Sequence, residues 1–180
     1  RVMRLAEKMG RPIITLIDTP GADCPDEAEA RGISEAIATT QRDMFSLKVP
    51  VVAVVIGEGG SGGAIGIGVG DRVLMMENSY YSVISPESCA AILWRDRALK
   101  EKAAEALKLT PEDALRLEVI DEIVPEPPGG AHTDKAQAAQ LLGRALKGAL
   151  DDLRDLSPEK LVARRYRKFR RIGTPQAGQD

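Results

Sequence analysis

The sequence predicts a single α/β domain built on a parallel β-sheet, and three observations support this. Short apolar runs alternate with stretches of helical periodicity along the 180 residues, the pattern of strands joined by helical crossovers. A glycine-containing turn follows each of the first two runs. Hydrophobic residues make up 43% and charged residues 29%, the composition of an ordinary soluble domain with one core.

Five apolar runs are the expected strands. The clearest spans residues 50–56, where β-branched side chains occupy nearly every position, as in strands buried on both faces. The other expected strands span residues 12–17, 72–76, 80–84 and 119–124. Strands of this length separated by helical segments favour a parallel sheet.

Helical spacing and capping residues predict the remaining elements. Residues 26–47 carry apolar side chains at helical spacing and are expected to form one helix. Ser85, Thr110 and Ser157 each precede a proline and an acidic residue, which is typical of helix starts. Two helices are expected to close the chain, with residues 1–173 forming the domain and 174–180 a frayed tail.

The first residues indicate a chain cut within a longer protein. Residues 1–9 have a helical pattern but no initiator methionine and no apolar signal region. We therefore expect a truncated amino-terminal part. No stretch approaches the roughly 18 apolar residues of a membrane span.

Charge and residue counts exclude several kinds of site. Lys and Arg total 25 against 27 Asp and Glu, a formal net charge of -2, which excludes a dedicated nucleic-acid coat. Two cysteines and one histidine, His132, do not support a disulfide framework, a structural zinc site or a Ser–His triad. Cysteine use favours the reducing cytosol.

Two nucleotide-binding motifs are matched only in part. Residues 57–62 fit G-x-G-x-x-G, and Glu77 lies about 20 residues on, as a dinucleotide site requires. The segment that follows is too short and too rich in glycine for the helix of that motif. Asp18-Thr19-Pro20-Gly21 resembles a GTPase turn, but the chain has no P-loop lysine.

A third interpretation takes the two glycine turns together as an oxyanion site. Each turn places a glycine at the carboxyl end of a buried strand, where the following amides face a helix start. Backbone amides so placed stabilise a developing oxyanion without a titratable side chain, and we assign this role to Gly62 and Gly63. The alternative is that such glycines only permit close packing, which we favour for Gly66, Gly68 and Gly70.

Several motifs together resemble the carboxyltransferase alpha-subunit family of bacterial and plastid-type acetyl-CoA carboxylase. The resemblance runs from Pro12 to Gly173. The motifs are IDTPGA at 17–22, residues 56–64, GVGD at 68–71, YSVISPE at 81–87, CA at 89–90, ILW at 92–94, PEP at 125–127, GGAH at 129–132, and Tyr166 with the basic stretch after it.

The resemblance implies a crotonase-like ββα superhelix and a biotin-dependent carboxyl transfer. Carboxybiotin on a separate carrier protein would give its carboxyl group to acetyl-CoA, forming malonyl-CoA for fatty-acid synthesis. Negative charge would develop on the biotin ureido oxygen and on the thioester enolate oxygen, each held by amides from one subunit. Biotin itself would take the methyl proton. No metal is expected in this chain.

The resemblance also places further residues around the site. Gly62 and Gly63 would be the principal donors, for the ureido oxygen or alternatively for the enolate. Gly21 and Ala22 would line the same cavity. Binding of substrate or biotin is further expected from Glu58, Gly59, Gly60 and Ser61, with Glu58 more often a supporting group in such positions.

The resemblance implies an enzyme that acts only with a beta subunit, as an α2β2 assembly. Its other partners would be the biotin carboxyl carrier protein and a biotin carboxylase that uses ATP, in the cytoplasm or plastid stroma. Two departures stand out: DCPD at 23–26 replaces the family's Tyr-Pro-Gly, and Ser88 replaces a glycine. The first adds a negative charge near the expected cavity mouth.

Two other functions remain open. A stand-alone crotonase-like hydratase or isomerase would need a pair of glutamates near the amide site, and none is convincingly placed. A non-catalytic assembly or nucleic-acid-binding subunit would use the basic stretch at 164–171. That stretch could receive the phosphates of CoA, an acidic partner or nucleic acid, or be a solvated helix face. The role of His132 stays open.

Overall fold

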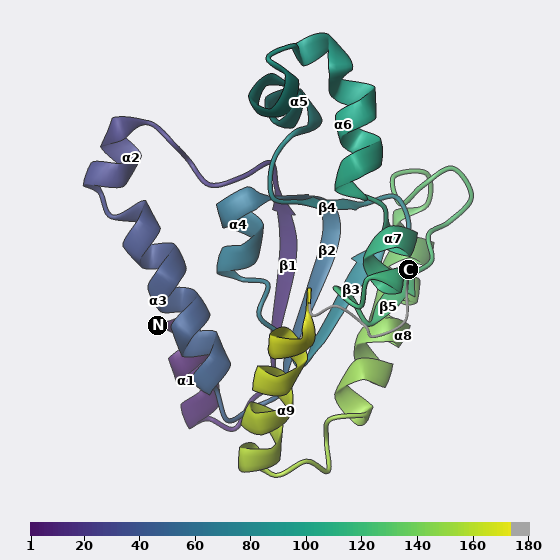
Figure 1. Ribbon diagram of the computed structural model, residues 1–180. Coiled ribbons are helices and arrows are strands. Elements are labelled where there is room, and N and C mark those ends of the chain that lie inside the picture. Colours follow the sequence, from purple (N-terminus) through teal and green to yellow (C-terminus); the bar gives the residue numbers. More distant parts are fainter. Residues whose placement is uncertain (174–180) are drawn as a thin grey trace.

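The structure, a computed structural model describing residues 1–173, is organised around a five-stranded sheet in which every strand pair is parallel (Figure 1). The tail expected at 174–180 lies outside the described residues. The strands are β1 (Ile13–Thr19), β2 (Val51–Gly60), β3 (Arg72–Met76), β4 (Tyr80–Ser82) and β5 (Glu122–Val124). The helices are α1 (Val2–Lys8), α2 (Asp26–Ala30), α3 (Ile33–Ser46), α4 (Ser61–Gly66), α5 (Pro86–Trp94), α6 (Lys100–Leu107), α7 (Pro111–Arg116), α8 (Lys135–Asp151) and α9 (Pro158–Arg171), with a 3₁₀ turn, η1, at Arg97–Leu99.

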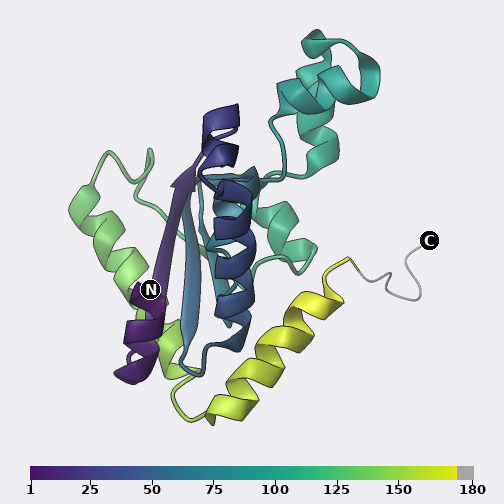
Figure 2. The ribbon, with the colours of Figure 1, turned by 90° about the vertical axis from the view of Figure 1, so that its left-hand side faces the viewer.

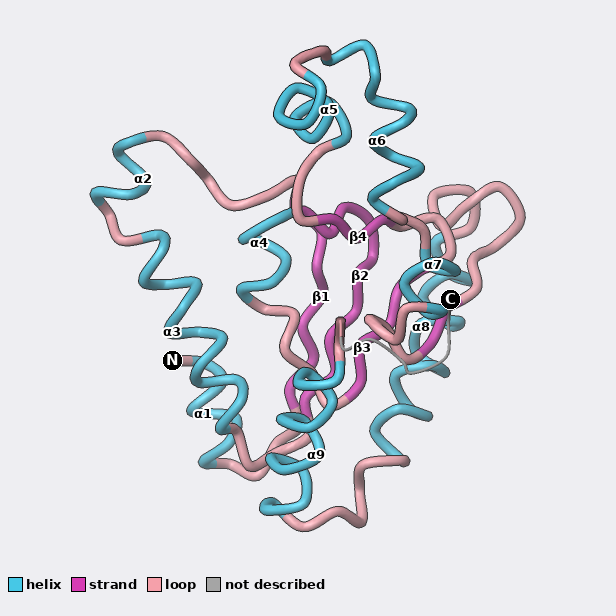
Figure 3. Tube along the Cα trace, in the orientation of Figure 1, coloured by secondary structure: helices cyan, strands magenta, loops and turns pink. Residues whose placement is uncertain are grey.

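Strand β2 is the centre of the sheet, whose order is β1-β2-β3-β5. Its first half pairs with β3, where Val52 lies opposite Arg72. Its last residues pair instead with β4, where Gly59 lies opposite Tyr81. In Figures 1 and 3, β4 crosses the carboxyl ends of β1 and β2. The sheet therefore changes direction where the glycine-rich turn begins.

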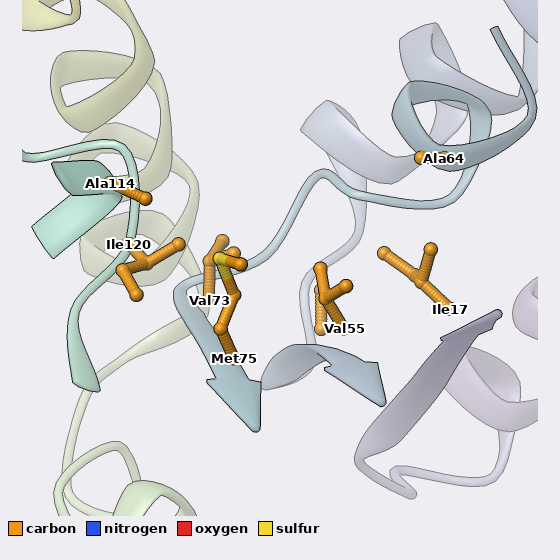
Figure 4. Close-up of a cluster of buried hydrophobic side chains, with 8 residues drawn as sticks. Ile17, Val55, Ala64, Val73, Met75, Ala114 and Ile120 are labelled. Atoms are coloured by element: carbon orange, nitrogen blue, oxygen red, sulfur yellow. The ribbon is translucent and has the colours of Figure 1, made fainter. Parts of the chain in front are cut away.

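Helices cover both faces of the sheet, as Figure 2 shows with α8 on one side and α3 and α9 on the other. The two faces of β2 belong to separate hydrophobic clusters because successive side chains alternate between faces. One cluster joins the sheet to α4 and α7 (Figure 4), and the opposite one joins it to α8. The first comprises Ile17, Ala53, Val55, Ala64, Val73, Met75, Ala114 and Ile120. No helix within residues 1–173 is long and apolar enough to cross a bilayer.

The three expected helix starts are confirmed. The hydroxyl of Ser85 accepts the backbone N–H of Ser88 at 3.2 Å at the start of α5, and Thr110 and Ser157 make the same contact for α7 and α9. In each case proline occupies the first turn. These caps satisfy amides that have no partner inside the helix.

The prediction of a single helix at residues 26–47 is wrong. The chain forms two helices, α2 and α3, because Gly32 between them adopts φ 83°, in the left-handed region. A helix cannot continue through that conformation, and glycine adopts it without the usual steric cost. Apolar spacing continues across the break, which is why periodicity alone suggested one helix.

Four expected strand bounds also differ by two or more residues, the first being the end of β1, which lies at Thr19 instead of residue 17. Strand β2 continues through the glycines to Gly60 instead of ending at 56, because β4 supplies a pairing partner there. Strand β4 stops at Ser82, whose hydroxyl donates to the carbonyl of Ile84 at 2.7 Å and turns the chain. Strand β5 begins only at Glu122, since the amides of the two residues at 119–120 bond to a carbonyl of α7.

The amino ends of the strands are held by a buried ion pair between Arg165 of α9 and Asp71, both fully buried. The guanidinium is bidentate to the carboxylate, with N–O distances of 2.6 and 3.0 Å. It also donates to the carbonyls of Met44, Leu47 and Val49 at 2.6–3.1 Å. A helix leaves its last carbonyls without partners, so Arg165 caps α3 from across the molecule.

A second carboxylate joins the loops after β3 and β5. Glu126 accepts the backbone N–H groups of Asn78 at 3.0 Å and Ala131 at 2.7 Å. Partial burial opposes its ionisation, but the hydrogen bonds from Asn78 and Ala131, together with the charge of His132, outweigh burial and hold the pKa of Glu126 below its usual range. The ionised carboxylate therefore stabilises the folded state.

Replacing Arg165 with methionine should lower the free energy of unfolding by about 3–5 kcal/mol, because Asp71 would stay buried without its partner. Urea denaturation followed by circular dichroism measures this. The matched control is Arg164→Met, one residue earlier and exposed, which should change stability by less than about 0.5 kcal/mol. Equal effects of the two substitutions would contradict this account of the core.

Glu126→Gln should cost about 1–2 kcal/mol at pH 7, where the native carboxylate is charged. The folded-state pKa is lowered, so this stabilisation is complete above the unfolded value of about 4.3 and is lost as pH falls through the folded value. Urea midpoints of the two proteins should therefore converge below about pH 4. A difference that persists unchanged at pH 3 would show that ionisation of Glu126 is not its source.

Candidate functional site

The two glycine turns lie against each other at the carboxyl ends of β1 and β2. A Cβ atom on Gly60 would lie 2.1 Å from the carbonyl oxygen of Pro20. One on Gly63 would lie 2.8 Å from the carbonyl carbon and oxygen of Gly21. Backbone thus packs on backbone, and a side chain at either position would force the turns apart.

Beside this contact is a cavity of about 340 Å³. One side is formed by the turns themselves, through Gly21, Ala22, Asp23 and Gly63. Helix α3 and the end of α4 form the remainder, through Ile33, Ala36, Ile37, Thr40, Gly66 and Ile67. The cavity therefore combines backbone polar groups with a mainly apolar wall, the usual composition of a small-molecule site.

Helix α4 begins at Ser61, so the amides of Gly62 and Gly63 belong to its first turn. Amides in a first turn have no carbonyl partner within the helix. Ser61 has φ 46°, a conformation that is uncommon for a residue other than glycine. A Cβ on Gly62 would lie 3.4 Å from the Ala22 side chain, so this amide is next to the residues that line the cavity.

The amide of Gly21 is already engaged. The hydroxyl of Thr19 accepts the Gly21 N–H at 3.2 Å and donates to the Gly21 carbonyl at 2.8 Å. This closed turn orders the backbone without leaving a donor for a ligand. Gly21 therefore shapes the cavity wall, while the first-turn amides of α4 remain available as donors for an oxyanion.

The other expected site residues fall into two groups. Gly59 and Gly60 are buried, and a Cβ on Gly59 would lie 2.8 Å from the Tyr80 carbonyl oxygen, so they pack the sheet. Glu58 is exposed, and its backbone N–H donates to Asp18 at 3.0 Å. Burial, then the charge of Glu58 and its hydrogen bond, raise the pKa of the Tyr80 phenol. Neither group lines the cavity.

The contribution of α3 to the cavity wall was not predicted from the sequence. Ile33 and Ile37 belong to the apolar helical pattern of residues 26–47, but the part of the helix face that they form covers a cavity instead of the core. Periodicity shows which face is apolar and not what it contacts. The turn closed by Thr19 was also missed, although Thr before Pro-Gly favours such a hydroxyl–backbone turn.

Comparison with known proteins finds relatives over nearly the whole chain. A family model described as acetyl co-enzyme A carboxylase carboxyltransferase-like matches residues 1–173. The chain is 57% identical over 173 residues to the acetyl-coenzyme A carboxylase carboxyl transferase subunit alpha of Flavobacterium psychrophilum, covering 96% of this chain and 55% of the relative. The protein of the same name from Picosynechococcus is 58% identical, at 96% and 53% coverage. The chain thus spans about half the length of the curated relatives it matches.

Solved structures share the fold at low sequence identity. The hetero-dimer of Pseudomonas malonate decarboxylase superposes with a TM-score of 0.67 at 18% identity, covering 94% of this chain and 72% of that one. Transcarboxylase 12S, solved with methylmalonyl-coenzyme A and methylmalonic acid, gives 0.63 at 21% identity, covering 80% and 29%. These likenesses confirm the expected crotonase-like α/β fold.

Gly60→Ala should lower the free energy of unfolding by about 3 kcal/mol or more, because the new methyl group would overlap the Pro20 backbone. Gly143→Ala is the matched control: nothing lies within 4 Å of its Cβ position in α8. It should raise stability by about 0.5–1 kcal/mol. Thermal melts compare the two, and a tolerated Gly60→Ala would disprove the close contact of the turns.

Proposed function

Because this chain belongs to the acetyl co-enzyme A carboxylase carboxyltransferase family, we propose that it supplies one oxyanion site of an acetyl-CoA carboxyltransferase. The reaction transfers a carboxyl group from carboxybiotin, held on a separate carrier protein, to acetyl-CoA and forms malonyl-CoA for fatty-acid synthesis. When bound, biotin supplies the carboxyl group that is transferred. The chain's own residues bind, orient and stabilise charge.

The observation that carries the proposal is the pair of amides at Gly62 and Gly63 beside a mainly apolar wall. Carboxyl transfer places negative charge on an oxygen, either the ureido oxygen of biotin or the enolate oxygen of the thioester. Amides aimed at such an oxygen stabilise its charge in a site that excludes water. They require no titratable group, which suits a chain with one histidine. The ureido oxygen is our assignment, and the enolate the alternative.

The apolar wall formed by α3 also suits the proposed substrate or biotin. A cavity of about 340 Å³ lies at the small end of the range for ligand sites. Its apolar side chains would pack against a ring or methyl group while the amides contact oxygen. Asp23 lines the same cavity, so its charge would oppose a second anion and favour one orientation of the substrate.

The proposal requires partners. We assign a carboxyltransferase beta subunit that completes the site in an α2β2 assembly, a biotin carboxyl carrier protein, and a biotin carboxylase that uses ATP. The relatives are named as subunit alpha, and the malonate decarboxylase of the same fold is a hetero-dimer; both support a shared site. The assembly would work in the cytoplasm or plastid stroma.

A stand-alone hydratase or isomerase is less well supported. Such an enzyme needs two carboxylates placed for proton transfer. Among the described residues that line the cavity, Asp23 is the one carboxylate, and Glu58 is exposed and lies outside that lining. If the chain were a non-catalytic subunit, it would bind its partners, and substitutions in α4 would not change the rate of carboxyl transfer.

The test is reverse carboxyl transfer from malonyl-CoA to free biocytin, followed as acetyl-CoA release, by the chain alone and with a beta-type partner. Activity should require both chains. Gly62→Pro removes one amide and should lower kcat about 10²–10³-fold, with the KM for malonyl-CoA nearly unchanged.

The control is Gly66→Ala, which adds a methyl group to the same cavity at an ordinary 3.6 Å from Ile37 and should keep most of the activity. Co-purification with the beta partner and a thermal melt establish that Gly62→Pro still folds, since proline also disfavours the conformation of Ser61 before it. Full activity of a folded Gly62→Pro complex would contradict the role of this amide.

A further inference from the structure

Helix α9 presents three unpaired arginines on one face. Arg164, Arg167 and Arg171 follow one another at spacings of three and four residues, which places them on the same side of the helix. All three are exposed, and within residues 1–173 none of their side chains makes a hydrogen bond or an ion pair. With Lys168 they line a hollow of about 340 Å³.

The carboxylates in this hollow are already paired. Asp71 is bonded to Arg165 and to the Val51 amide. Asp121 is bonded to Lys168 and accepts the Val73 amide at 2.6 Å. The charges of the three arginines therefore remain uncompensated, in a protein whose net charge is -2.

Lys168 contributes positive charge at the floor of the hollow. Burial holds the pKa of its ammonium group below the usual range, although the charge and hydrogen bond of Asp121 oppose this shift. The neighbouring cation Arg72 is paired with Glu122 at 3.2 Å and with Asp152 at 3.3 Å. The arginines of α9 are thus the groups available to an incoming ligand.

A second hollow adjoins the first and differs in character. It has a volume of about 270 Å³ and shares Asp121, Lys168 and Arg171 with the first hollow. Leu115, Glu118, Ile120 and Ile172 complete its lining. The second hollow thus adds three apolar side chains and the carboxylate of Glu118 to the cations of the first. We name the two hollows together the basic groove.

The spacing of the arginines indicates the size of the anion. At about 1.5 Å of rise per residue, Arg164 and Arg171 are separated by roughly 10 Å along the helix axis. One phosphate group cannot contact all three guanidinium groups over that length. Two or more linked phosphates can, and arginine binds phosphate oxygens in a bidentate manner.

The basic groove lies far from the glycine turns. Asp71 and Asp121 immediately precede the first residues of β3 and β5, so the groove adjoins the amino ends of these strands. Gly62 and Gly63 follow the carboxyl end of β2, which is ten residues long, or about 33 Å. A ligand in the groove would not occupy the cavity described above.

We infer that the basic groove binds a small molecule that carries two or more phosphate groups. The phosphates contact Arg164, Arg167 and Arg171, and a less polar part lies beside Leu115 and Ile172. The inference does not depend on the proposed carboxyl transfer. A nucleic-acid strand is disfavoured because the unpaired cations span only about 10 Å on one helix of an otherwise near-neutral chain.

The experiment is isothermal titration calorimetry of the full chain with inorganic tripolyphosphate at low ionic strength. We expect one site, with orthophosphate binding at least 10-fold more weakly. Arg167→Gln should reduce tripolyphosphate affinity at least 10-fold, and the triple change of all three arginines to glutamine should abolish binding. Arg144→Gln, an exposed arginine of α8 outside the groove, should leave affinity unchanged.

The same titration with ATP and with free coenzyme A separates two sources of the phosphates. The natural ligand belongs to the class of the compound that displaces tripolyphosphate from the native chain. The same compound should bind Arg167→Gln more weakly. No binding of tripolyphosphate by the native chain would overturn the inference, as would equal affinity in Arg167→Gln and Arg144→Gln. Binding of single-stranded DNA that strengthens with strand length, without competition by tripolyphosphate, would replace the small molecule with nucleic acid.

Discussion

The buried guanidinium of Arg165 is the contact on which the arrangement of the elements depends. It joins the carboxylate before β3, the end of α3 and the chain entering β2. A charge at that depth is tolerated only when its donors are satisfied, and five hydrogen bonds to Asp71 and three carbonyls do this. Helix α9 is thereby fixed at the amino ends of the strands.

Fixing the amino ends of the strands also determines which turns lie together at their carboxyl ends. Strands β1 and β2 pair from Ile13 opposite Val51 to Ile17 opposite Val55, and a register shift then places Thr19 opposite Gly59, so the turns that follow them emerge side by side. The contact between them is backbone on backbone, at Gly60 and Gly63. The same close contact brings the first turn of α4 to the cavity under α3. Packing and the candidate chemistry therefore depend on the same glycines. These residues permit the close contact of the two turns and also place the amides of the candidate oxyanion site.

Helix α9 divides its basic residues between two tasks. Arg165 points inward and is fully buried, while Arg164 and Arg167 on either side of it are exposed. Along the sequence they form one charged stretch, and only their position relative to Asp71 separates them. The buried residue stabilises the fold, and its exposed neighbours form the basic groove. One helix thus links the core to a surface that is independent of the glycine turns.

The sequence by itself determined the local structure and the family. Capping residues located three helix starts, β-branched runs located the strands, and the two glycine turns with their flanking motifs indicated a carboxyltransferase of the crotonase-like fold. Those features follow from contacts within a few residues, which sequence records directly. Tertiary structure decided the break at Gly32, the extension of β2 to Gly60, the burial of Arg165 and the α3 wall of the cavity. It also showed that the amide of Gly21 is taken by Thr19. Each of these depends on which distant segment supplies a partner, and neither periodicity nor composition contains that information.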